Sequence, residues 1–128
     1  MGSRTARADE DTKRRRSSAR KELWARTELY FGLGGDEGGI VSDLDFARFI
    51  DVEVATRFQR GLTVLSGHGR FLDAGGTVHN ERSKILILYY PLAESGASEK
   101  LDEIRATYKK RFNQQSVLRV ESISWVSC

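Results

Sequence analysis

The stretch Glu81-Arg82-Ser83-Lys84-Ile85-Leu86-Ile87-Leu88-Tyr89-Tyr90 decides the fold that we predict for this chain. Its second half, from Ile85 to Tyr90, is apolar without interruption. Successive side chains of a β-strand point to opposite faces of the sheet, so a strand formed here is apolar on both faces. A sheet with one face in water alternates apolar and polar residues instead. We therefore predict a strand inside the sheet, with helices on one face and a second cover on the other.

The composition predicts one domain preceded by a charged tail. A chain of 128 residues, 39% of them hydrophobic, has enough apolar side chains for one small core. Residues 1–22 hold eight Lys or Arg against four Asp or Glu, so the basic character of the chain lies there. Low hydrophobicity combined with many charges is typical of disorder. We predict a disordered basic N-terminal tail over residues 1–22 and a single domain over residues 23–128.

The tail contains the run Lys13-Arg14-Arg15-Arg16, which has two interpretations. One is an electrostatic arm that touches nucleic acid. The other, which is more common for chain ends, is a solubilising segment. No apolar stretch follows the arginines, which argues against a secretory signal or a membrane span. Cys128 is the only cysteine, so an internal disulfide is excluded. We expect a cytoplasmic protein without a membrane partner.

The hydrophobic patterns predict six elements. In chain order they are a strand over residues 27–33, a helix capped by Ser42 and ended by Gly61, a strand over 62–72, a strand over 77–90, a helix over 99–112 capped by Ser98, and a strand over 116–125. Apolar residues at three- and four-residue spacing indicate the helices, and alternation indicates the strands. Two glycines around His68 predict a bulge or a local bend in the second strand. The segment Asp73–Gly76 predicts a hairpin turn.

This order of elements is that of the ferredoxin-like, split βαβ fold of the α+β class. Right-handed crossovers then give the strand order 4-1-3-2, with both helices on one face of an antiparallel sheet. The third strand lies inside that sheet, as its composition requires. The opposite face is bare in a single chain. We therefore expect a homodimer stacked sheet to sheet, as in a dimeric α+β barrel.

Four separate motifs resemble one bacterial family. They are Arg26-Thr27-Glu28-Leu29-Tyr30-Phe31-Gly32, Arg57-Phe58-x-x-Gly61-Leu62-Thr63-Val64, Glu81-Arg82-Ser83-Lys84, and Tyr108-x-x-Arg111-Phe112 with its continuation to Val120. Over about residues 24–126 the chain is similar to the uncharacterised family known as domain of unknown function 3574. That family has no assigned activity, so the resemblance implies no particular chemistry.

Three common ligand classes find no support in the sequence. The glycine-rich loop that begins at Gly32 has Glu37 where a dinucleotide-binding loop needs its last glycine. His68, His79 and Cys128 have no metal-ligand spacing, and a C-terminal cysteine is a poorly supported nucleophile. The third strand has aliphatic residues where an RNA-binding strand has aromatic ones. We expect no cofactor, no metal, and no RNA surface on the folded domain.

Polar side chains inside the four motifs provide the candidate site residues. The topology places four of them at one edge of the sheet, beside the glycine-rich loop: Glu81, Arg82, Arg111 and Gln115. It places Glu28 and Tyr30 on the face away from the helices, and Arg26 and Arg57 at the opposite edge. The arginines and Gln115 are candidate ligand-binding residues. Ion pairs that set the strand register or close the dimer are an equally good interpretation.

These residues support three functional hypotheses. In the first, the homodimer binds a small polar or anionic ligand. Arg82 and Arg111 hold this ligand, and Glu81, Tyr30 and Gln115 orient it. In the second, the protein is an enzyme of the dimeric α+β barrel kind. Glu81 or Glu28 then acts as general base, and Tyr30 donates a hydrogen bond. In the third, the domain is a structural or interaction module whose tail touches nucleic acid.

Overall fold

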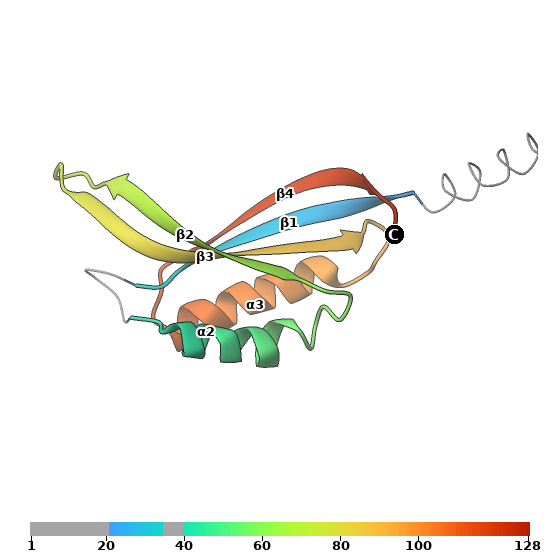
Figure 1. The fold of residues 1–128 in the computed structure, drawn as a ribbon, viewed down its shortest axis with the longest axis horizontal. Helices are drawn as coiled ribbons and strands as arrows, with labels where there is room; N and C mark the ends of the chain where they lie inside the picture. Colours follow the sequence, from blue (N-terminus) through green and yellow to red (C-terminus); the bar gives the residue numbers. More distant parts are fainter. Residues whose placement is uncertain (1–20, 35–39) are drawn as a thin grey trace, which may run out of the picture.

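The computed structural model describes residues 21–34 and 40–128. In chain order its elements are β1 (Glu22–Gly32), α2 (Asp43–Phe49), η1 (Ile50–Val54), β2 (Thr63–Leu72), β3 (Val78–Pro91), α3 (Ala97–Arg111) and β4 (Val117–Val126). The short π-helix η1 continues α2, so the predicted order of strand, helix, strand, strand, helix, strand is confirmed (Figure 1). The predictions for the basic tail and for most of the glycine-rich loop fall on residues 1–20 and 35–39, outside the described residues.

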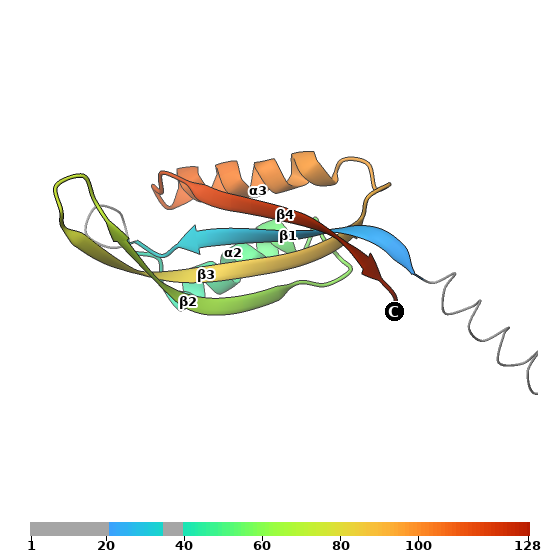
Figure 2. The ribbon, with the colours of Figure 1, turned by 90° about the horizontal axis from the view of Figure 1, so that it is seen from above.

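The four strands form one antiparallel sheet in the order β2-β3-β1-β4. This is the predicted order 4-1-3-2 read from the other edge, and β3 lies inside the sheet as its apolar sequence requires. Both helices lie on the same face of the sheet (Figures 1 and 2). The fold class and topology predicted from the sequence are therefore confirmed.

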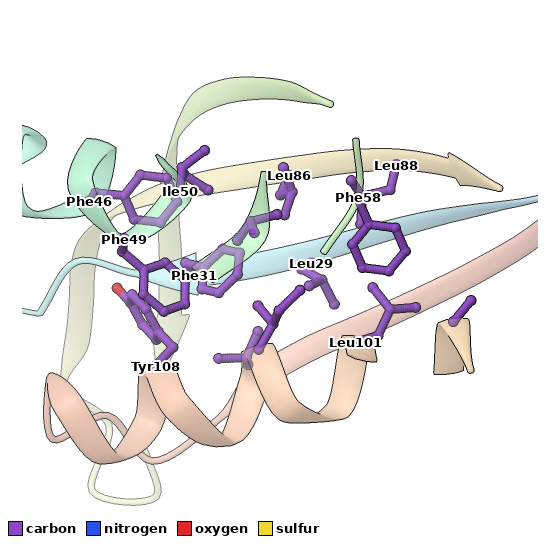
Figure 3. Packing of buried hydrophobic residues seen from close by; sticks show 14 of the residues in the cluster. Leu29, Phe31, Phe46, Phe49, Ile50, Phe58, Leu86, Leu88, Leu101 and Tyr108 are labelled. Carbon is purple, nitrogen blue, oxygen red and sulfur yellow. The ribbon is translucent and has the colours of Figure 1, made fainter. Parts of the chain in front are cut away.

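The core lies between the sheet and the two helices (Figure 3). From β3 it receives Leu86 and Leu88, which are almost fully buried. Aromatic rings fill the end of this layer, where the ring of Phe31 lies 4.7 Å from that of Tyr108 in an edge-on arrangement. Each such side chain contributes roughly 1.5–3 kcal/mol by leaving water. The packing of these rings fixes α3 across the end of β1.

The other face of the sheet has no cover within residues 21–34 and 40–128. On β3 its residues are the half-buried Ile85 and Ile87 and the exposed Tyr89. We refer to this surface, away from the helices, as the open face. The apolar strand thus keeps one face accessible in the single chain, and the sheet-to-sheet homodimer stays a prediction.

The first predicted helix begins as expected but ends early. Ser42 is its N-cap, because the Ser42 hydroxyl accepts a hydrogen bond of 3.0 Å from the main-chain N–H of Asp45. The predicted end at Gly61 is wrong. At Ile50 the main-chain hydrogen bonds change to five-residue spacing, and the N–H of Arg57 then bonds to the carbonyl of Val54 at three-residue spacing. The change to three-residue spacing ends the helical segment several residues before Gly61.

The predicted N-cap of the second helix is also wrong. The N-cap of α3 is Gly96, whose φ of 80° lies in the left-handed region, and Ser98 already belongs to the first turn. The Ser98 hydroxyl instead accepts a hydrogen bond of 3.2 Å from the Arg119 guanidinium on β4. The Ser98 side chain, which the sequence assigned to capping, therefore makes a tertiary contact with β4 instead.

Two strand predictions need correction. β2 has no bulge, because its register with β3 is continuous from Thr63 opposite Ile87 to Leu72 opposite Val78. The glycine at position 67 provides space instead: a Cβ there would come within 3.0 Å of side-chain atoms of its neighbours on β3. β1 begins at residue 22, within the predicted tail, because it pairs with β4 from that residue onward. No described helix is long and apolar enough to cross a membrane.

Candidate functional site

A row of polar side chains crosses the open face along β1. Arg26, Glu28 and Tyr30 alternate with the buried residues Thr27 and Leu29, so the row points away from the helices. This confirms the predicted orientation of Glu28 and Tyr30. The side chain of Glu28 is only 19% exposed, although no helix covers it.

The members of this row are hydrogen-bonded to one another and to β3. The Tyr30 hydroxyl donates to the Glu28 carboxylate at 2.6 Å, and Arg26 Nη1 donates to the other oxygen of the same carboxylate. Arg26 Nε also donates to the Tyr89 hydroxyl at 3.0 Å. Tyr89 was not among the candidate residues of the sequence. Its position directly opposite Arg26 in the register of β1 and β3 is what reveals it.

These contacts determine the protonation of the row. The hydrogen bond from Tyr30 and then the one from Arg26 lower the pKa of the Glu28 carboxyl. The same bond to Glu28 raises the pKa of the Tyr30 phenol. Near neutral pH Glu28 is therefore charged and Tyr30 keeps its proton. Such a carboxylate is suited to stabilising charge, whereas a general base needs a pKa closer to the working pH.

Glu81 adds a second carboxylate at the end of this row. Its side chain lies over Gly32, the last residue of β1, and occupies the space that a Cβ on Gly32 would need. The residue is half-buried, and no described Lys or Arg forms an ion pair with it. Its negative charge, after the larger effect of burial, raises the pKa of the Tyr108 phenol. Together with Glu81 of β3, the row on β1 thus presents two carboxylates and one arginine.

Apolar side chains of β3 and β4 flank the row on both sides. The register places Tyr30 between Ile85 and Leu118, and it places Glu28 between Ile87 and Val120. Of these neighbours, Leu118 is 59% exposed and Val120 is 41% exposed. A row of charged side chains inside an accessible apolar surface is more typical of an interaction or ligand site than of a sheet face in water.

The structure does not bring the predicted anion-binding arginines together. Arg82 donates to Asp43 at the start of α2 at 2.7 Å, and Arg111 donates to Glu53 in η1 at 2.7 Å. At about 1.5 Å per helical residue, these two carboxylates lie at opposite ends of the α2–η1 segment. Gln115 is exposed in the loop before β4. Each arginine already has a carboxylate partner, so this edge is a set of ion pairs.

Arg26 and Arg57 are likewise held by different carboxylates. Arg57 donates to Glu53 at 2.9 Å and to Glu103 at 3.3 Å, on the helical side of the sheet. Arg26 stays on the open face with Glu28. The two arginines therefore do not form a joint site at this edge, although Arg57 lines a cavity that also includes Tyr89.

Two cavities formed by the described residues do not contain the row on β1. One, of about 410 Å³, lies beside the start of α3 and is lined by Glu94, Glu99 and Glu121 among others. The second, of about 340 Å³, is lined by Arg57, Tyr89 and their neighbours. The row on β1 lies on an open surface, so a ligand there gains full burial only from a second cover.

The two histidines lie on the arms of the β2–β3 hairpin. His79 forms a hydrogen bond of 2.7 Å with Asp73, and its ring stacks on Phe71 at 4.9 Å. His68 is exposed on the other arm. Within residues 21–34 and 40–128, no group of three or more His, Cys, Asp or Glu side chains is placed to hold a metal ion.

Comparisons with known proteins place the chain in a family and a fold. The family described as "Protein of unknown function (DUF3574)" matches residues 26–128. A comparison with curated proteins gives no match. Among solved structures, a phage SAM lyase in complex with S-methyl-5'-thioadenosine is similar, with a TM-score of 0.59 and 14% identity over 82% of this chain and 90% of that chain. A phage SAM lyase in the apo state has a TM-score of 0.55 and 16% identity over 84% and 90%. At this identity the likeness concerns the fold alone.

Proposed function

We propose that this chain, which belongs to the family of unknown function DUF3574, binds a small organic cation on the open face of its sheet, between two copies of itself. The observation that supports the cation is the Glu81 carboxylate. It is half-buried, and no described Lys or Arg pairs with it. A charge removed from water without a partner is costly, so a ligand of opposite charge is favoured at this position.

One side chain near Glu81 suits a cation that carries a planar ring. Tyr30, two residues before Gly32 on the same face of β1, is 37% exposed on the open face. Aromatic faces attract organic cations through the ring quadrupole. Glu28 contributes less charge of its own, because Arg26 already neutralises it. The same arrangement disfavours the anionic ligand that the sequence suggested.

A second copy supplies the cover that a small ligand requires. Ligand sites bury most of a ligand's surface, which a flat sheet face cannot do alone. The exposed aliphatic residues on both sides of the row, such as Leu118 and Val120, provide apolar area for contact between two sheets. The proposed homodimer would therefore close the site and cover the second face of β3 in one step.

The fold comparison suggests which cation to test first. A structural neighbour is described as a SAM lyase in complex with S-methyl-5'-thioadenosine. S-adenosylmethionine combines a sulfonium charge with an adenine ring, which is the class of ligand that Glu81 and the nearby Tyr30 favour. We infer from this agreement that a nucleoside carrying a sulfonium group is the best first candidate.

A second candidate function is an enzyme that acts on the same ligand. It is favoured by the contrast between the two carboxylates: Glu28 is held by Arg26 and Tyr30, whereas Glu81 has no described cationic partner. Tyr30, whose pKa is raised, would act as a hydrogen-bond donor. Of the predicted catalytic residues, Glu81 is therefore the better candidate for a base.

Calorimetric titration with S-adenosylmethionine and S-methyl-5'-thioadenosine tests the binding. We expect saturable binding of the sulfonium compound that Glu81→Gln weakens at least about tenfold, the usual effect of losing a charged partner. Asp51→Asn, on the exposed side of η1, is the matched control and should leave binding unchanged. Absence of binding, or equal weakening by both variants, would refute the cation site. Release of S-methyl-5'-thioadenosine during incubation, followed by chromatography, would identify an enzyme.

Light scattering on the eluting protein tests the second copy. Val120→Arg places a charge among the aliphatic residues of the open face, and Leu44→Arg places one on the exposed side of α2. We expect a dimer that only the first variant dissociates, with loss of ligand binding in the same variant. A monomeric wild-type chain that still binds the ligand would contradict the shared site.

A further inference from the structure

We propose that the domain has a second, separate site, for a small molecule with a phosphate or carboxylate group. The site is the cavity of about 340 Å³ between the segment after η1 and the end of β3. Its size falls in the range of small-molecule pockets. Its polar and charged lining residues include Arg57, Arg60, Glu94 and Lys100, and its aromatic lining residues are Phe58, Tyr89 and Tyr90.

The cavity exists because β3 is longer than its partner β2 at this end. The ladder between the two strands begins at Thr63 opposite Ile87, so Tyr89 and Tyr90 have no β2 residue beside them. The chain between η1 and β2 passes along this unpaired edge and forms the opposite wall. A strand edge of this kind has main-chain groups available for polar contacts. The cavity therefore combines a charged wall with a main-chain edge.

Two of the lining cations are held by aromatic rings. The Arg60 guanidinium lies over the Trp24 ring at 5.6 Å, and Lys100 Nζ lies over the Phe58 ring at 6.0 Å. Cation–π contacts orient a charge without neutralising it. Arg60 forms an ion pair with Glu94, and the two groups are 3.8 Å apart, which is beyond hydrogen-bond distance. Both cations thus keep N–H donors available for a ligand.

The charge balance of the lining favours an anion. Arg57, Arg60 and Lys100 face a single carboxylate, Glu94, among the described lining residues. Arg57 is held by Glu53 and Glu103, which leaves Arg60 and Lys100 as the groups that would contact the anion. A guanidinium presents paired donors that match a phosphate or carboxylate, and an ammonium adds a point charge.

The aromatic lining determines the rest of the ligand. Phe58 and Tyr90 are buried core residues whose rings lie 6.2 Å apart, and Tyr89 closes the side toward the open face. These rings provide an apolar surface for an organic group attached to the anion. The favoured ligand is therefore a small aromatic or heterocyclic molecule with one anionic group. Its charge is opposite to that of the ligand proposed for the open face, so either site can fail without the other.

Titration of isotope-labelled full-length protein with phenyl phosphate and, separately, with benzoate tests this site at constant ionic strength. We expect saturable shifts of the main-chain amide signals between Arg57 and Gly61. Saturation by phenyl phosphate alone would identify phosphate as the anionic group, and saturation by benzoate would identify carboxylate. Shifts that do not saturate with either compound would overturn the proposal.

Charge-removing variants locate the contacts. Arg60→Gln and Lys100→Met should each raise the dissociation constant at least about tenfold, as expected for the loss of a charged hydrogen-bond donor. Lys110→Met removes an exposed lysine at the end of α3 that does not line the cavity, and it should leave the constant unchanged. Equal weakening by all three variants would mean general charge attraction and would also overturn the site.

Discussion

The carboxylate of Glu81 occupies the space that a side chain on Gly32 would fill. Gly32 does not adopt a positive φ, so the backbone there would accept any residue. A glycine is needed here because the Glu81 carboxylate, from the neighbouring strand β3, lies over this position. This contact holds Glu81 at the end of the row formed by Arg26, Glu28 and Tyr30, which makes Gly32 a positioning residue for the proposed cation site.

Gly32→Ala should therefore displace Glu81 without unfolding the domain. The displaced group is the end of a flexible side chain, and alanine lowers the entropy of the unfolded chain by about 0.4–1 kcal/mol, which offsets part of the strain. We expect a free energy of unfolding within about 1 kcal/mol of wild type and clearly weaker binding of S-adenosylmethionine. Gly69→Ala is the control, since its Cβ would meet only the main-chain oxygen of Glu81 at 3.7 Å. Unchanged binding in Gly32→Ala would show that the position of Glu81 does not matter.

Tyr108→Phe should destabilise the fold. The Tyr108 phenol is fully buried and donates a hydrogen bond to the main-chain oxygen of Gly32, which ties α3 to the end of β1. Removing the donor leaves that oxygen without its partner, at a cost of about 1–3 kcal/mol. Urea denaturation measures the loss. Tyr30→Phe, on the exposed open face, should lower stability by less than Tyr108→Phe, and equal effects would argue against the importance of the buried bond.

The same phenol should make stability fall at high pH. Burial and the nearby Glu81 raise the pKa of Tyr108 in the folded state, so the folded chain keeps a proton that the unfolded chain releases above pH about 10. The stabilisation is complete below that pH and is lost as the pH rises toward the folded-state pKa. Urea midpoints measured between about pH 8 and pH 11 should decline in wild type and decline less in Tyr108→Phe. Parallel slopes would contradict this assignment.

Ser42→Ala and Ser98→Ala should differ, although the sequence suggested the same capping role for both. The Ser42 hydroxyl accepts the N–H of Asp45 at the start of α2, and its loss should cost about 1 kcal/mol. Ser98 contacts Arg119 on the molecular surface and caps no main-chain group of α3, so its loss should cost less than about 0.5 kcal/mol. Thermal or urea denaturation of both variants measures the two losses of stability. Equal losses would mean that Ser98 also supports its helix.

Gly67→Val and Gly69→Val should separate the two glycines of β2. A Cβ on Gly67 would lie 3.0 Å from side-chain atoms of Ile85 and Ser83, so valine there should cost about 1–3 kcal/mol by overpacking. Position 69 is open, and a β-branched residue suits a strand, so valine there should be neutral or stabilising. Circular dichroism during denaturation measures both. A stable Gly67→Val variant would contradict the requirement for space.

Part of the fold followed from local sequence patterns. The unbroken apolar run from Ile85 to Tyr90 required an interior strand, and with the order of elements it led to the correct sheet topology. The N-cap at Ser42 was predictable because the capping bond spans three residues. The cap at Ser98 was not, because Arg119 approaches it from β4. The prediction of a bulge around Gly67 was wrong for the same reason, because this glycine leaves room for side chains on the neighbouring strand β3.

The candidate site depended more on tertiary structure. The sequence correctly placed Glu28 and Tyr30 on the open face, because alternation along a strand is a local property. It did not predict that Arg82 pairs with Asp43 or that Tyr89 joins the row through Arg26. A long charged side chain reaches several partners, and only the packed positions of the strands and helices decide which one it meets. By itself the sequence determined the layers, their order and the direction of each strand residue. The tertiary structure decided which charges are neutralised and which, like that of Glu81, have no described cationic partner, since pairing depends on distances between segments far apart in the chain.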